Sequence, residues 1–100
     1  MHQYVNPYDM SVGGEYQVRA GFDCHIVKCY ITRAGNLTNP QGNTNLFPDV
    51  KRILKYQGRE KMHGDVFFWF SLTGFKKAPQ GMLLGFREAD YRTHWSIRHV

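Results

Sequence analysis

The chain has 100 residues, which is about one small domain. It carries 13 Lys+Arg against 8 Asp+Glu, for a formal net charge of +5, and 15% of its residues are aromatic. That aromatic content excludes an intrinsically disordered chain, and the composition excludes collagen-like and coiled-coil proteins. The longest apolar run, Val66–Phe70, is far shorter than the ~18 residues of a membrane-spanning helix. These features predict a small, basic, globular domain that does not enter a membrane.

The N-terminal residues show no regular periodicity. Pro7 and the pair Gly13-Gly14 interrupt any helix or strand pattern. We therefore expect an irregular N-terminal arm at 1–13 and a single α+β domain at 14–100. The first residues lack the basic and apolar regions of a secretion signal, and two cysteines are too few for a disulfide scaffold. A cytoplasmic location with reduced thiols is the expectation.

Two β-strands are predicted near the start of the domain. Apolar and polar residues alternate over 16–20, and β-forming residues fill 24–32. The turn residues between them favour an antiparallel hairpin. A long segment rich in Asn and Gly follows at 34–45, which predicts a surface loop of the kind that often serves a function.

The next segment carries the signals of a helix. Pro48 suits a first helical position, Asp49 suits the first turn, and Gly58 suits a helix end. Four apolar residues recur at helical spacing and are expected to face the core: Phe47, Val50, Ile53 and Leu54. The sequence thus predicts one amphipathic helix.

Three further strands are predicted after the helix, at 65–72, 82–86 and 95–98. The first is apolar on both faces, which is typical of a central strand. The order β-β-α-β-β-β predicts an α+β fold, with a single antiparallel sheet of about five strands and one helix packed on one face. The residues expected in the core are Val18, Ile26, Val50, Ile53, Leu54, Phe68, Phe70 and Leu83.

Basic residues are concentrated in the predicted helix and beyond it. Such density is typical of proteins that bind the phosphate backbone of nucleic acid, although a solvated helix face can look the same. The candidate anion-binding residues are Lys51, Arg52, Lys55, Arg59, Lys61, Lys76 and Lys77. Further positive charge lies near the C-terminus, at Arg87, Arg92 and Arg98.

Phe67 and Trp69 alternate with core positions on their strand. If that face of the sheet is open, the two rings can stack on bases, as in proteins that bind single-stranded RNA. If the face is covered, they belong to the core. A third interpretation is that they contact another protein, because aromatic residues anchor interfaces.

The C-terminal segment contains groups that could perform acid–base chemistry. Glu88, His94 and His99 lie within twelve residues, and small ribonucleases combine a carboxylate with histidine and cationic groups. The cysteines and histidines have no spacing typical of a zinc site, and no phosphate-binding loop or dinucleotide motif is present. We therefore expect no metal and no cofactor.

Three functions remain open at this stage. The first is a non-catalytic module that binds nucleic acid, either RNA or single-stranded DNA. The second is an inhibitor or adaptor of the phage or mobile-element type, which binds a host protein or the nucleic-acid channel of that protein. Its partner would be an acidic protein or one that handles nucleic acid. The third is a metal-independent ribonuclease or toxin that uses the C-terminal histidines.

Overall fold

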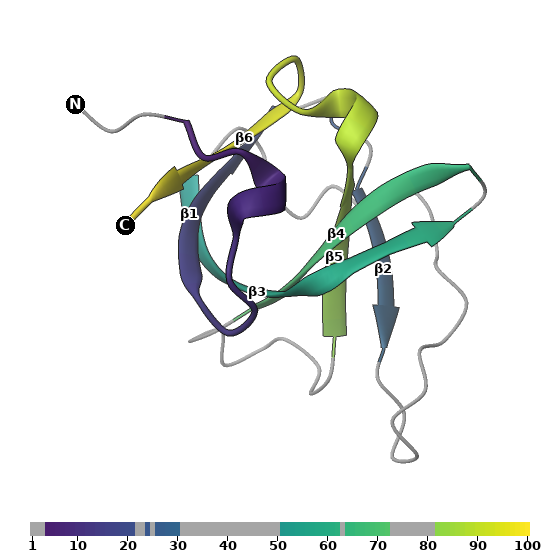
Figure 1. The fold of residues 1–100 in the computed structure, drawn as a ribbon, viewed down its shortest axis with the longest axis horizontal. Coiled ribbons are helices and arrows are strands. Elements are labelled where there is room, and N and C mark those ends of the chain that lie inside the picture. Colours follow the sequence, from purple (N-terminus) through teal and green to yellow (C-terminus); the bar gives the residue numbers. More distant parts are fainter. Residues whose placement is uncertain (1–3, 22–23, 25, 31–50, 63, 73–81) are drawn as a thin grey trace.

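The computed structural model describes residues 4–21, 24, 26–30, 51–62, 64–72 and 82–100. Its strands are β1 (Glu15–Ala20), β2 (Ile26–Tyr30), β3 (Lys51–Met62), β4 (Asp65–Leu72), β5 (Met82–Arg87) and β6 (Trp95–His99). Two 3-10 helices, η1 (Pro7–Asp9) and η2 (Glu88–Asp90), complete the described elements. The strands form one antiparallel six-stranded sheet in the order β2-β5-β4-β3-β1-β6, which curls into a half-barrel (Figure 1).

The predicted α+β fold is wrong, because the segment read as a helix forms the first part of β3. Leu54 and Tyr56 are buried on one face of β3, whereas Ile53 between them is 44% exposed. Burial therefore follows the two-residue period of a strand and not the helical period. Ile53 was expected in the core and lies outside it; Phe47 and Val50 fall outside the described residues.

Gly58 ends no helix. It lies inside β3 with φ +115°, and the pairing of β3 with β4 shifts register between Tyr56 and Gly58. An extra residue at this point makes a β-bulge, a feature in which glycine readily supplies the positive φ. The glycine that suggested a helix end thus allows one long strand to continue to Met62.

The predicted hairpin of the first two strands is also wrong. β1 pairs with β3 and β6, whereas β2 pairs with β5 at the opposite edge of the sheet. Alternation within a strand determines which side chains face the core, but it does not choose the partner strand. Near the end of β1 the chain is held by hydrogen bonds from Gly21 N to His94 O, 2.8 Å, and from Cys24 N to Gly21 O, 3.2 Å.

The three strands predicted in the second half of the chain are confirmed as β4, β5 and β6. β4 lies between β5 and β3, and Phe68 and Phe70 on its concave side are completely buried. Four other expected core residues are buried as well: Val18, Ile26, Leu54 and Leu83. A second buried cluster, on the opposite face of the sheet, contains Val27, Phe67, Trp69 and Leu83.

The N-terminal residues 4–13 pack against the curled sheet. Val5 and Met10 belong to the same buried cluster as Phe68, and Val5 N donates to Ile97 O at 2.9 Å. Asn6 begins η1, and its side chain accepts a hydrogen bond from Tyr8 N at 3.0 Å. These contacts fix the backbone from which two tyrosines, Tyr4 and Tyr8, reach the surface.

Within the part of the chain that the structure describes, no helix is long and apolar enough to cross a membrane. The Asn- and Gly-rich segment at 34–45, which was expected to form a surface loop, lies outside the described residues.

Candidate nucleic-acid interface

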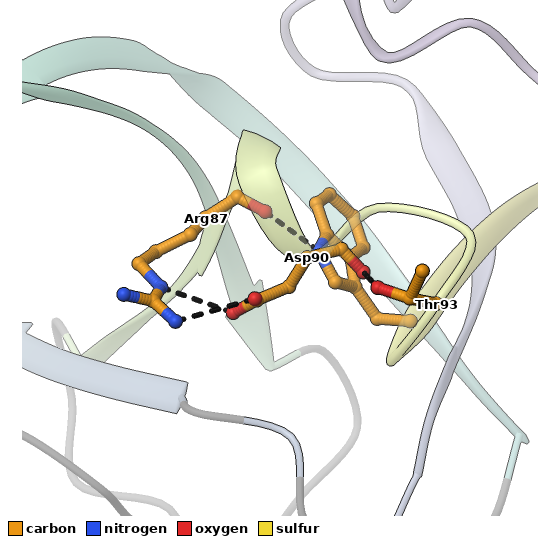
Figure 2. Close-up of polar contacts among 4 residues, drawn as sticks. Arg87, Asp90 and Thr93 are labelled. Carbon is orange, nitrogen blue, oxygen red and sulfur yellow. Dashed lines mark hydrogen bonds and ion pairs between the residues drawn. The ribbon is translucent and has the colours of Figure 1, made fainter.

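The short helix η2 is held by an ion pair between its flanking residue Arg87 and its last residue Asp90 (Figure 2). Arg87 Nε and an Nη atom donate to the two carboxylate oxygens of Asp90 at 3.0 and 3.2 Å. This bidentate arrangement is the strongest form of an arginine–carboxylate contact. The hydrogen bond to Asp90 raises the pKa of Arg87.

Three more hydrogen bonds fix the segment that follows η2, and Figure 2 draws the one between Thr93 and Asp90. The indole Nε1 of Trp95 donates to Arg87 O at 2.8 Å. The Asp90 carbonyl accepts from Thr93 Oγ1 at 3.1 Å and from His94 N at 2.9 Å. The backbone between Arg87 and Trp95 is therefore rigid, and it presents the side chains of the residues in between at defined positions.

Arg92 is the one non-glycine residue with positive φ in the described part of the chain, at +75°. This conformation costs about 1–3 kcal/mol and persists only where the surroundings hold it. Here Arg92 N donates to Trp95 O at 2.7 Å. The strained backbone directs the guanidinium over the ring of Tyr4, with 3.6 Å between its carbon atom and the ring centroid.

A second arginine meets the same tyrosine. The guanidinium carbon of Arg98 lies 4.5 Å from the Tyr4 ring centroid. The pKa of Tyr4 is lowered, first by a hydrogen bond from Arg98 and then by the positive charges of Arg98, Arg92 and Arg19. The lowered pKa reports a positive electrostatic potential at the exposed Tyr4 hydroxyl, which is the potential that attracts phosphate.

Tyr4 separates two hollows in the surface. The smaller, of about 70 Å³, is lined by Tyr4 together with polar side chains of β1 and β6: Gln17, Arg19, Ser96 and Arg98. One water occupies about 30 Å³ in the liquid. A space of about 70 Å³ therefore suits a group only slightly larger than a water, such as a phosphate. The cross-strand pairs Gln17–Arg98 and Arg19–Ser96 place these four side chains on one face of the sheet.

The larger hollow, of about 500 Å³, lies between the N-terminal segment and η2. Its walls include the rings of Tyr4, Tyr8 and Tyr91, and Arg92 and Glu88 also line it. Tyr91 is fixed because its hydroxyl donates to Val5 O, which joins η2 to the N-terminal segment. Three aromatic rings with one cation and one carboxylate make a surface suited to a flat polar ligand.

Glu88 joins this hollow to a third one, of about 290 Å³, which Lys61 and Gly64 of the β3–β4 hairpin also line. Glu88 accepts a hydrogen bond from the Tyr8 hydroxyl, and this bond is the main cause of the raised pKa of Tyr8. The guanidinium carbon of Arg59 lies 4.9 Å from the Tyr8 ring centroid. A cation therefore stands beside each exposed tyrosine.

The three hollows are neighbours on the surface because they share lining residues, and we call them together the cationic groove. Tyr4 lines the first two hollows and Glu88 lines the second and third. Its lining residues belong to β1, β6, the N-terminal segment with η1, the segment around η2 and the end of the β3–β4 hairpin, whose backbone can be followed in Figure 1. The cations that line it are Arg19, Arg92, Arg98 and Lys61, and Arg59 lies beside it, against the ring of Tyr8.

The basic residues predicted from the sequence do not form one helical surface. From Lys51 to Lys61, β3 spans about 33 Å of extended chain, with the expected cations spread along it. Lys55 lies opposite Glu15 on one face, whereas Arg59 and Lys61 lie opposite Phe68 and Val66 and share their face. Among the described residues of the predicted patch, Lys61 lines the groove and Arg59 lies beside it, against Tyr8.

The remaining members of the predicted patch are Arg52, Lys51, Lys76 and Lys77. Arg52 is exposed on β3 opposite Val18, and the backbone of Lys51 lies opposite Arg19. Lys76 and Lys77 fall outside the described residues.

Phe67 and Trp69 do not offer an open stacking surface. Their side chains are only 7% and 3% exposed, and their rings stack on each other with centroids 6.0 Å apart. Trp69 lies flat against Gly85, where a Cβ would come within 2.6 Å of the indole. The aromatic side chains available to a ligand are instead Tyr4 and Tyr8, 42% and 44% exposed.

The three residues considered for acid–base catalysis are not assembled into one site. His94 precedes β6 and His99 ends it, so roughly 16 Å of extended chain separates them. A general acid and a general base must both reach one substrate within hydrogen-bond distance. Glu88 faces the groove and is engaged by Tyr8, and His99 lies near the ring of Tyr16 at the other end of β6.

Sequence reasoning missed the centre of the groove. Arg92 and Arg98 were recognised only as part of the total charge, and Tyr4 and Arg19 were not singled out. The four residues come from three distant segments and are joined by the β1–β6 pairing and by the Tyr4–Arg98 bridge. No local spacing signals such an arrangement.

No protein-family model, curated protein or solved structure shows significant similarity to this chain. In the described part of the chain, no three His, Cys, Asp or Glu side chains are grouped so that they could hold a metal ion.

Proposed function

We propose that this protein is a non-catalytic binding module for single-stranded nucleic acid, RNA or DNA, and that the strand lies along the cationic groove. The observation that carries the proposal is the contact of the exposed Tyr4 ring with Arg92 and Arg98, close to the charge of Arg19. Positive charge and an exposed aromatic ring meet there, which matches the alternation of phosphate and base in a nucleic-acid strand.

The chemistry of the groove favours a single strand over a duplex. Arginine forms paired hydrogen bonds with phosphate oxygens, and an exposed tyrosine ring stacks on any base. In a duplex the faces of the bases are occupied by their neighbours, so the rings of Tyr4 and Tyr8 would have no partner. Only an unpaired strand uses both kinds of side chain.

The cations that line the groove outnumber its carboxylates. Asp90 is engaged by Arg87 in an ion pair. Arg98, Arg92 and Arg19 lower the pKa of Tyr4 and supply positive potential around it. A reducing compartment such as the cytoplasm suits the buried Cys24, which forms no disulfide within the described part of the chain.

The test is fluorescence anisotropy with a labelled twelve-nucleotide RNA and with DNA of the same sequence, at several salt concentrations. We expect micromolar or tighter binding with a negative salt slope, because each phosphate contact on a single strand adds about 0.7 to its steepness. Replacing Arg92 and Arg98 by Ala should weaken binding at least tenfold and reduce the slope by about 1.4.

The matched control is Lys55→Ala, which removes one positive charge from a residue that lines none of the three hollows. We expect it to change the affinity less than twofold. If Lys55→Ala weakened oligonucleotide binding as much as the replacement of Arg92 and Arg98, only the total charge of the protein would matter. Absence of oligonucleotide binding at low salt would overturn the proposal and favour the alternative of a protein partner.

A further inference from the structure

The larger hollow of the groove has the size and lining of a site for one unstacked base. Its volume of about 500 Å³ lies in the range of pockets that hold small ligands. Tyr4 and Tyr8 provide exposed rings from the N-terminal segment, and Tyr91 provides a fixed ring from the end of η2. Flat aromatic ligands stack on such rings.

Glu88 determines which chemical groups this hollow accepts. Its carboxylate is exposed and lines the hollow, so it repels a phosphate and attracts hydrogen-bond donors. One of its oxygens, Oε2, accepts from the Tyr8 hydroxyl, which fixes the orientation of the carboxylate. An ionised carboxylate has about four lone-pair sites, so acceptor capacity remains on both oxygens.

The donors that fit a fixed carboxylate differ among the four bases. Guanine presents two neighbouring donors, N1–H and the N2 amino group, and a carboxylate can accept from both at once. Adenine and cytosine place an acceptor beside their amino group, and uracil flanks its single N3–H with two carbonyl oxygens. Those acceptors face the negative oxygens of a carboxylate, which is unfavourable.

We infer that the larger hollow is a guanine-selective site, in which Glu88 accepts hydrogen bonds from N1–H and the N2 amino group of one unstacked base. The inference rests on the proposed function, and it assigns base preference to a groove that otherwise binds any strand. The phosphate next to the base lies beyond Tyr4 in the smaller hollow, where Arg19 and Arg98 neutralise it. Tyr4 lines both hollows, so its side chain lies between the base and the phosphate.

The experiment compares five nine-nucleotide RNAs, each of eight uridines around a central G, inosine, A, C or U. We expect the RNA with G to bind about tenfold more tightly than the all-U strand, because a good bidentate pair discriminates by roughly 5- to 150-fold. Inosine lacks the N2 amino group, so its strand should fall between the two. This part uses the unaltered protein and does not depend on any variant.

The matched variants are Glu88→Gln and Glu60→Gln, each of which removes one exposed carboxylate charge. Glu88→Gln should abolish the preference, so that the strand with G binds no more tightly than the all-U strand. Glu60→Gln should keep the preference, since Glu60 lies on β3 opposite Phe67 and lines none of the three hollows.

The two proposals fail in different ways. Equal binding of all five RNAs, or a preference that survives Glu88→Gln, overturns the guanine site and leaves the single-strand function intact. Absence of binding to every RNA and to the DNA of the same sequence overturns both.

Discussion

The guanidinium carbon of Arg92 lies 3.6 Å from the centroid of the Tyr4 ring, although these residues belong to opposite ends of the chain. The contact depends on the positive φ at Arg92 and on the backbone bridge between Tyr4 and Arg98, a residue of β6. The centre of the groove therefore exists only when the N-terminal segment is docked on the sheet. Docking and binding are expected to depend on each other.

The ring of Tyr4 is expected to matter more than its hydroxyl. Tyr4→Leu removes the stacking surface and should weaken oligonucleotide binding by about 5- to 150-fold, the usual range for one base–aromatic contact. Tyr4→Phe keeps the ring and loses only the hydrogen bond with Arg98, so its effect should be several times smaller. Fluorescence anisotropy measures both. Equal losses in the two variants would contradict a stacking role.

The pKa values of the two exposed tyrosines, Tyr4 and Tyr8, should lie on opposite sides of the usual value of 10.0. The pKa of Tyr4 is lowered by Arg98 and by the neighbouring positive charges, whereas the hydrogen bond to Glu88 raises the pKa of Tyr8. NMR titration of the two rings, assigned with Tyr4→Phe and Tyr8→Phe, gives the order directly. If Tyr8 lost its proton first, the described environments would be wrong.

The same shifts predict how stability changes with pH. The pKa of Tyr8 is raised in the folded protein. Its contribution to the free energy of unfolding is therefore fully present below pH 10.0 and is lost as the pH rises through the pKa of the folded state. The stability difference between the unaltered protein and Tyr8→Phe should therefore shrink at alkaline pH. Because the folded pKa of Tyr4 is lowered, its electrostatic contribution is present above pH 10.0 and is lost as the pH falls through the folded value. Urea denaturation at pH 8 and at pH 11 tests both.

Asp90 is expected to support both stability and binding. Asp90→Ala removes the two hydrogen bonds from Arg87 and should lower the free energy of unfolding by about 1.5–3 kcal/mol. Thr93→Val, which removes one neutral hydrogen bond to the Asp90 carbonyl, should cost about 0.5–1.5 kcal/mol. Urea denaturation gives both values. A cost for Asp90→Ala no larger than that for Thr93→Val would show that the ion pair is unimportant.

Gly85 is expected to tolerate no side chain. A Cβ there would lie 2.6 Å from Cζ3 of Trp69 and 2.8 Å from Cγ2 of Val27, so Gly85→Ala should destabilise the protein by about 1–3 kcal/mol. In a Trp69→Phe background, the indole atoms that cause the clash are absent, and the added cost should be smaller. A double-mutant cycle measured by urea denaturation tests this coupling. Equal costs in both backgrounds would contradict the described packing.

The strands of the second half of the chain could be predicted because their signal is local. Phe68 and Phe70 alternate with Phe67 and Trp69, so periodicity alone indicated a central strand, but it did not decide whether the face of Phe67 and Trp69 is covered. The same reasoning failed for β3, since Pro48 and Gly58 both fit the ends of a helix. Leu54 and Tyr56 become buried because β1 and β4 pair on either side of β3, and no pattern inside the segment reveals those partners.

The candidate site was harder to predict than the fold. Charge density drew attention to β3, but extended geometry places its basic residues on two faces. The residues that converge are Tyr4, Arg19, Arg92 and Arg98, which meet only after β1 pairs with β6 and the N-terminal segment docks. Glu88 was noticed for catalysis, whereas the structure places it in the wall of the groove.

The central claim is that single-stranded nucleic acid lies along the cationic groove. The most direct measurement is a ¹H–¹⁵N NMR titration that follows backbone amides and arginine Nε–H groups while a uridine-rich nine-nucleotide RNA with one central G is added. We expect the largest shift changes at Tyr4, Arg92 and Arg98, followed by Arg19 and Arg59. Changes confined to the face of β3 that carries Ile53 and Lys55, with Arg92 and Arg98 unaffected, would contradict the account.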